Sequence, residues 1–240
     1  MRTMILTATA AALSLGACTG SNAEPAGPNV QRDYQVATFD KIEVAGPFDV
    51  TVTTGGQPSV HASGPSNLLD KMEVVVEGGV LKIRPEKRNS MFNWNFGRDG
   101  KATIAVSVPM LSEAAIAVSG GVSIDKITGD SFKGEIAGSG DLRLAAVDAG
   151  AVELSIAGSG DVAATGKAKS VTYEIAGSGG INAKSLTAET AKVSIAGSGS
   201  VGAHASGTAD VEIVGSGDVA LTGGAKCTIS KHGSGDVTCS

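Results

Sequence analysis

The sequence predicts an all-β fold, a single-stranded right-handed β-helix (β-solenoid) with about 18–20 residues per coil. Two observations carry this prediction: a short glycine-rich motif recurs at a nearly constant step, and the residues between its copies alternate between apolar and polar types. The composition agrees, because 34 glycines accompany only one Trp, two Tyr and five Phe. So few aromatic rings cannot fill a core of ordinary size, which must therefore be built from Val, Ile, Leu and Ala.

The motif Ile-Ala-Gly-Ser-Gly, or a variant of it, marks a corner in each repeat. Its copies stand at 136–140, 156–160, 175–179, 195–199, 213–217 and 231–235, with a degenerate copy at 118–121. From Gly138 onward, successive copies are 20, 19, 20, 18 and 18 residues apart, a step typical of solenoid coils. We interpret residues 113–240 as the repeat region of the β-helix, and a two-sheet sandwich built from hairpins is the alternative.

Apolar residues on both sides of each corner follow a period of two. Val152, Leu154 and Ile156 precede one corner, and Val162 and Ala164 follow it. This period indicates β-strands with one buried face. Successive coils should place like side chains above one another at about 4.8 Å, so we expect continuous aliphatic ladders. The corner glycines are structural in this interpretation, because tight turns need positive φ or close backbone approach.

Residues 33–112 are less regular, and we predict that they form the N-terminal β coils and cap of the same continuous domain. Strand-like alternation recurs in three segments, 39–52, 72–83 and 102–108. Gly78 and Gly79 mark a hairpin-like corner. Only residues 66–71 suggest a helical turn.

Residues 1–17 are predicted to form a signal peptide. Arg2 supplies the positive start, and the uncharged apolar stretch of about 14 residues that follows is too short to span a bilayer as a helix. The letters LGAC at 15–18 resemble the lipobox of bacterial lipoproteins. That resemblance implies cleavage before Cys18 and attachment of a lipid to its sulfur. Ordinary cleavage after Ala23 is the alternative.

Residues 18–32 are polar and rich in Pro and Gly, so we expect a flexible tether. Thr19 follows the cysteine, and by resemblance to lipoproteins of two-membrane bacteria the lack of Asp there implies the outer membrane. We therefore expect an exported protein of the bacterial cell envelope, held at the membrane by its N-terminal lipid and facing the periplasm or the cell surface.

Cys227 and Cys239 are predicted to form a disulfide, because export places this even pair in an oxidising compartment. Both stand at inward positions beside the last corner, so a bridge would pin the terminal coil. Two buried free thiols are the alternative. Lys231 replaces the Ile of earlier copies, and we expect it to protect the exposed strand edge from aggregation.

Four features in this order resemble a known family. They are Phe39-Asp40-Lys41-Ile42-Glu43-Val44, Gly46-Pro47-Phe48-Asp49-Val50, Gly78-Gly79-Val80-Leu81-Lys82-Ile83 and the Gly-Ser-Gly-Asp-Val repeats. The sequence is similar over about 36–240 to the head GIN domain family, also described as "putative auto-transporter adhesin". The resemblance implies an exported bacterial β-helix, often a lipoprotein, with no chemistry to carry over to particular residues. We expect no membrane β-barrel segment in this chain, and therefore no self-secretion as an autotransporter.

The formal net charge of −5 and the lack of a basic stripe predict no nucleic-acid partner. An Asp follows the corner in four coils, at Asp141, Asp161, Asp218 and Asp236. Calcium binding is the functional hypothesis for these residues, but nonapeptide calcium repeats recur every nine residues and place the Asp one position later. We expect these carboxylates to hydrogen-bond their own turns, with no metal and no cofactor bound.

Catalytic candidates are few. The histidines are His61, His204 and His232, and none lies in a recognisable nucleophile or zinc-ligand motif. One glutamate per coil precedes the corner, at Glu135, Glu153, Glu174 and Glu212. A ladder of carboxylates would repel itself, so we expect these residues to be solvated and offset by lysines. We predict that the protein is not an enzyme, and a polysaccharide lyase or hydrolase is the alternative.

Phe92, Trp94 and Phe96 form the most unusual segment, because they are three of the eight aromatic residues. They are either a plug for the open end of the solenoid or a candidate partner-binding patch for a sugar or a protein. We predict an envelope lipoprotein that acts as an adhesive, binding or structural β-helix scaffold for a glycan or an envelope protein. Self-association through the flat ends is a further expectation. A calcium-dependent surface protein remains a third hypothesis.

Overall fold

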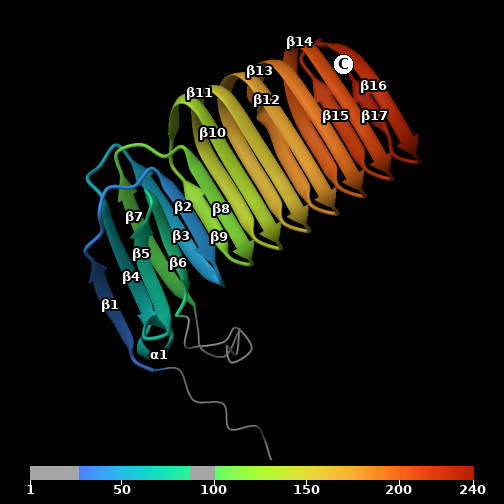
Figure 1. The fold of residues 1–240 in the computed structure, drawn as a ribbon. Helices are drawn as coiled ribbons and strands as arrows, with labels where there is room; N and C mark the ends of the chain where they lie inside the picture. The colour runs from blue at the N-terminus through green and yellow to red at the C-terminus, as the bar shows by residue number, and fades with distance from the viewer. Residues whose placement is uncertain (1–26, 87–100) are drawn as a thin grey trace, which may run out of the picture.

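The computed structural model describes residues 27–86 and 101–240, which form one 17-stranded sheet wound into a β-solenoid (Figure 1). The predicted all-β solenoid is therefore confirmed. Its repeat region consists of β8 (Glu113–Val118), β9 (Gly121–Ile124), β10 (Ile127–Gly138), β11 (Asp141–Gly158), β12 (Asp161–Gly177), β13 (Gly180–Gly197), β14 (Ser200–Gly215), β15 (Asp218–Thr222), β16 (Lys226–Gly233) and β17 (Val237–Cys239).

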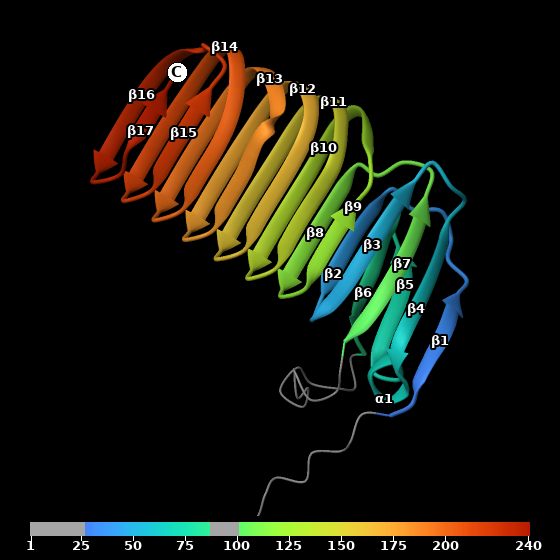
Figure 2. The same ribbon diagram turned by 180° about the vertical axis from the view of Figure 1, so that it is seen from behind.

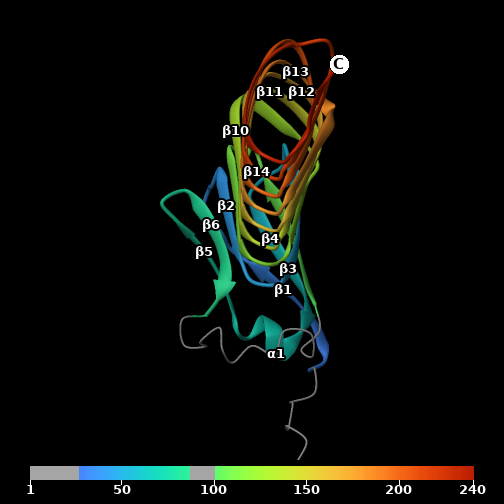
Figure 3. The ribbon, with the colours of Figure 1, turned by 90° about the vertical axis from the view of Figure 1, so that its right-hand side faces the viewer.

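Successive coils pair in parallel and keep their corners in register. Gly158 pairs with Gly138 on one side and with Gly177 on the other, and the same row continues to Gly233. The chain turns at each Gly-Ser-Gly, so the two long sides of a coil run in opposite directions (Figure 2). The interior is therefore a flattened tube with strands on both broad sides (Figure 3).

The core is a set of aliphatic ladders. Ile136, Ile156, Ile175, Ile195 and Ile213 lie above one another, and each is at most 2% exposed. Burial of each such side chain contributes about 1.5–3 kcal/mol, so the tube is stabilised coil by coil.

From Gly138 onward the first corner residue is always glycine, and Gly158 shows why. Its φ is +139°, and a Cβ built on it would lie 2.2 Å from the carbonyl oxygen of Gly138 in the coil before. Both the backbone conformation and the close stacking therefore require glycine.

The N-terminal coils do not follow chain order. β2 (Lys41–Ala45) and β3 (Phe48–Thr54) form a coil that pairs in parallel with β8 and β9 on one side. On its other side it pairs in parallel with β6 (Val80–Pro85) and β7 (Ala102–Val108). The coil of residues 41–54 is thus inserted between two later segments.

The N-terminal end is closed by further elements. β5 (Met72–Glu77) pairs antiparallel with β6 on one broad side. On the other side β4 (Ser59–Pro65) pairs antiparallel with β7, and β1 (Asn29–Tyr34) pairs antiparallel with β4. The helix α1 (Ser66–Leu69) lies at this end and buries Leu68 and Leu69. The expected helical turn, the strand at 102–108 and the hairpin at Gly78-Gly79 are therefore confirmed.

Candidate functional site

An open groove of about 810 Å³ follows the broad side of the solenoid that starts after the Gly-Ser-Gly corners. It crosses β3, β9, β11, β12, β13, β14, β15 and β17, so its floor runs from the coil of β2 and β3 through every coil of the repeat region. With about 4.8 Å between strands, this floor is roughly 30–35 Å long.

The first row of side chains in the groove stands directly after the corner. Strand register aligns these residues in the order Asp49, Gly121, Asp141, Asp161, Gly180, Ser200, Asp218 and Asp236. They project outward because the next residue of each strand, such as Leu142 or Val162, is buried. The row is therefore acidic but interrupted. Carboxylates stand on neighbouring coils only at Asp141 with Asp161 and at Asp218 with Asp236.

One aspartate of this row contacts the next coil rather than its own turn. Asp218 Oδ1 accepts a 2.9 Å hydrogen bond from the backbone N–H of Asp236. For Asp218 the expectation of a bond within its own turn is therefore wrong. Within 27–86 and 101–240, no three His, Cys, Asp or Glu side chains lie close enough together to hold a metal ion.

The second row lies two residues further along each strand and carries other polar groups. It includes Thr51, Ser123, Arg143, Asn182 and Thr238, with Lys184 at its edge. The sequence analysis missed these residues, although counting two positions beyond each corner residue would have found them. Together the two rows offer carboxylates, an amide, hydroxyls and cations along one open surface.

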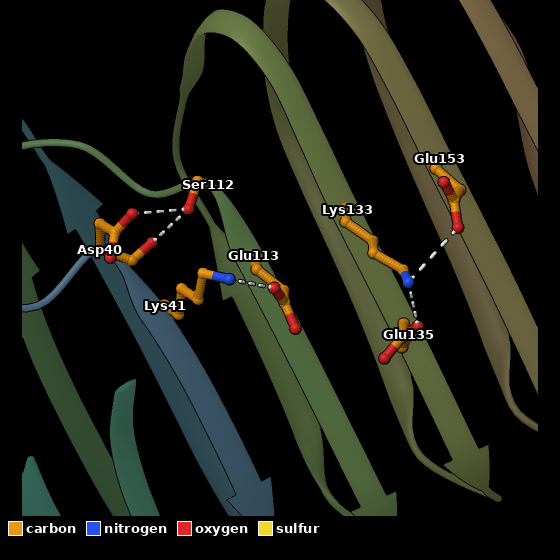
Figure 4. A network of polar contacts seen from close by, with 7 residues as sticks. All are labelled: Asp40, Lys41, Ser112, Glu113, Lys133, Glu135 and Glu153. Atoms are coloured by element: carbon orange, nitrogen blue, oxygen red, sulfur yellow. Dashed lines mark hydrogen bonds and ion pairs between the residues drawn. The ribbon is translucent and has the colours of Figure 1, made fainter. Parts of the chain in front are cut away.

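The opposite broad side carries a network of ion pairs at its N-terminal half (Figure 4). Lys41 Nζ lies 2.9 Å from Glu113 Oε2, and this hydrogen bond raises the pKa of Lys41. Lys133 Nζ lies 2.7 Å from Glu135 Oε1 and 3.5 Å from Glu153 Oε1 (Figure 4). The hydrogen bond to Glu135 raises the pKa of Lys133.

The four glutamates that precede the corners do not share one row. Glu153 pairs in register with Lys133, whereas Glu135 pairs with Ser155. Glu174 and Glu212 follow in the row of Glu135, separated by Ser194. The carboxylates in that row are therefore two coils apart, at about 10 Å, and do not crowd one another. The expected offset by a lysine is confirmed at Lys133.

The three histidines lie on β4, β14 and β16. His61 Nδ1 is 2.5 Å from Asp33 Oδ1, which ties β4 to β1, and His204 Nδ1 is 3.2 Å from Thr222 Oγ1 in the next coil. His232 is exposed at the terminal coil. Their contacts are those of strand-pairing residues.

Cys227 and Cys239 form a disulfide, with their Cα atoms 6.7 Å apart. The bridge joins β16 to β17 in the terminal coil, where the sequence analysis expected it. Cys18 and the aromatic residues Phe92, Trp94 and Phe96 lie outside the described residues. In the described part, no helix has the length and apolar character needed to cross a membrane.

A family model described as "Putative auto-transporter adhesin, head GIN domain" matches residues 38–225. The chain belongs to this family. The match covers both the inserted N-terminal coil and nearly all of the repeats, so the head GIN domain includes the groove as far as β15. No curated protein matches the chain at a significant level.

Solved structures agree with this membership. A "putative adhesin" from Bacteroides fragilis is 24% identical, with a TM-score of 0.78 over 89% of this chain and 97% of its own. A "putative adhesin" from Parabacteroides merdae is 18% identical, with a TM-score of 0.70 over 89% and 98%. These two show that the head GIN domain fold is shared. A "putative lipid binding protein" from Parabacteroides distasonis is 26% identical, with a TM-score of 0.71 over 88% and 97%.

Proposed function

We propose that this head GIN domain protein is an exported envelope lipoprotein, anchored through Cys18, that serves as a non-enzymatic adhesive scaffold. The observation that carries the proposal is the groove, which starts at Asp49 on β3 and continues through every coil of the repeat region to Thr238. A surface built this way suits an extended ligand, such as a glycan chain or a strand of an envelope protein, rather than a small substrate. The family description and the names of its solved relatives support an adhesive role.

The anchor is tested by metabolic labelling with palmitate, comparing the wild type with Cys18→Ala and fractionating the envelope. We expect label in the wild type, found with the outer membrane, and no label in Cys18→Ala. A wild type that is soluble and unlabelled would contradict the anchor without affecting the groove.

The adhesive role is tested by retention of the protein on immobilised envelope polysaccharides and peptidoglycan. Arg143→Glu, in the second row of the groove, should lower retention at least about tenfold, equivalent to about 1.4 kcal/mol. Lys192→Glu makes the same charge change on the opposite broad side and should have little effect. Release of new reducing ends would instead favour the polysaccharide-active enzyme, and retention that needs calcium would favour the calcium-dependent protein.

A further inference from the structure

The C-terminal end of the solenoid presents two strand edges. β16 pairs with β14 and β17 pairs with β15, and within the described residues no strand pairs with their outer edges. The N–H and C=O groups that point away from the solenoid at this end need water or another strand as partners.

The aliphatic core is also uncovered at this end. Ile229 continues the ladder of Val211, but it is 48% exposed whereas Val211 is 2% exposed. Cys227, Val237 and Cys239 continue the ladder beside it and are only half-buried. An apolar surface that is continuous with the core therefore faces outward from the last coil.

The two ends of the solenoid do not match each other. At the N-terminal end α1 buries Leu68 and Leu69, and the β5–β6 hairpin leans away from the side formed by β1 and β4 (Figure 3). A terminal coil placed there could not pair with both sides at once. Head-to-tail stacking of copies is therefore unfavourable.

We propose that a second copy of this chain covers the C-terminal end, giving a closed end-to-end dimer with two-fold symmetry. β16 and β17 run in opposite directions on the two broad sides (Figure 2). A two-fold-related copy presents strands antiparallel to both edges at the same time, whereas a separate peptide could pair with only one. The isologous contact uses up the free end of each copy, so assembly stops at two.

Charge decides which strands meet. β16 carries Lys226, Lys231 and His232 and no acidic residue, while Asp236 directly precedes β17. Pairing β16 with the partner's β17 keeps the two cationic strands apart and brings His232 to the side of the partner's Asp236. Ile229 then packs on the apolar end of the partner's core.

One coil end is smaller than a standard interface of about 800 Å² per partner, so we expect micromolar affinity.

The test is sedimentation equilibrium on the full exported chain carrying Cys18→Ala, so that a lipid cannot drive association. We expect a reversible dimer, with a longest dimension in small-angle scattering close to twice that of the monomer. Ile229→Lys should raise Kd at least about tenfold. The matched control is Met110→Lys, because Met110 is 54% exposed between β7 and β8, away from the terminal coil, and Kd should not change.

A charge exchange keeps the test decisive if Ile229→Lys fails to fold. Asp236→Lys should weaken the dimer, and Asp236→Lys combined with His232→Glu should restore it. A chain that stays monomeric at about 100 µM would overturn the proposal. So would growth beyond a dimer, or equal weakening by Met110→Lys and Ile229→Lys. None of these outcomes depends on whether Cys18 is lipidated or whether the groove binds a ligand.

Discussion

Lys231 Nζ donates a 2.6 Å hydrogen bond to the carbonyl oxygen of Gly235 across the last corner of the solenoid. Lys231 is in register with Ile213 and stands where the core ladder would otherwise continue. Its aliphatic stem covers apolar surface while its amine satisfies a corner carbonyl and leaves a charge at the strand edge.

Lys231→Ile should make the terminal coil more prone to association, because it extends the exposed ladder and removes the edge charge. We expect light scattering to rise at a protein concentration roughly tenfold lower than in the wild type. Ser230→Ile is the control, since it adds the same side chain to the outward face of β16. Equal scattering from both variants would show that the inward position has no special role.

Gly177→Ala should destabilise the fold strongly, because it combines two penalties. Gly177 has a φ of +137°, and a Cβ there would lie 2.2 Å from the carbonyl oxygen of Gly158. Gly55 has a φ of +91° but nothing within 4 Å of its would-be Cβ, so Gly55→Ala tests the backbone penalty alone. We expect losses of roughly 3 kcal/mol or more for Gly177→Ala and about 1–2 kcal/mol for Gly55→Ala, measured by urea unfolding. Equal losses would mean that stacking adds nothing.

The repeats could be predicted because their signal is local and periodic. Ile156 and Ile175 stand at the same place relative to a corner, so counting along the chain aligns them. Counting back from the corner glycine would also have placed Glu153 and Glu135 in different rows. The disulfide was predicted from the even pair of cysteines and the expected export.

The order of the N-terminal coils could not be predicted in this way. Lys41 pairs with Glu113, 72 residues away, and no periodicity links the two segments. The insertion of residues 41–54 between two later segments is defined by long-range strand pairings, which leave no periodic signal in the sequence. The second row of the groove was missed for a simpler reason: Arg143 and Asn182 share a position but no residue type.

Tyr173→Phe should stabilise the protein by about 1 kcal/mol. Tyr173 is fully buried between Leu154 and Val193, and its hydroxyl has no hydrogen-bond partner within the described residues. Removing an unsatisfied buried hydroxyl relieves its desolvation. Tyr34→Phe is the control, because Tyr34 lies in the partly exposed edge strand β1 and its hydroxyl interacts with Arg32, so a smaller gain is expected.

Tyr173 also predicts a pH dependence. Burial raises the pKa of Tyr173 above its ordinary value of 10.0, so the folded state holds this proton more tightly than the unfolded state. The part of the free energy of unfolding that is linked to this proton is therefore fully present below pH 10. It is lost as the pH rises from 10 toward the folded-state pKa, because the unfolded chain then releases the proton first. Urea unfolding between pH 9 and pH 11 should show a shallower decline for Tyr173→Phe than for the wild type. Parallel curves would contradict the assignment to Tyr173.

Val118→Gly should stabilise the protein by roughly 1 kcal/mol. Within the described residues Val118 is the one non-glycine residue with positive φ, +77°, and it pairs with the corner glycine Gly138. A β-branched residue is strained there, and its side chain is 41% exposed, so little packing is lost. Val214→Gly removes an exposed Val from a position without positive φ and should be destabilising. A loss of stability in Val118→Gly would show that packing outweighs the strain.

Replacing both Cys227 and Cys239 by Ser should loosen the terminal coil and leave the middle of the solenoid unchanged. The bridge spans a sequence separation of 12 residues, for which chain entropy suggests a stabilisation of about 3 kcal/mol. In a solenoid each coil contacts only its neighbours, so this loss stays local. Hydrogen exchange should therefore accelerate in β16 and β17 by roughly a hundredfold, the equivalent of about 2.7 kcal/mol, and not in β12. Cys18→Ala is the control and should change the exchange rate neither in β16 and β17 nor in β12. Faster exchange in β12 of the Cys227 and Cys239 variant would show that the terminal bridge controls the whole fold.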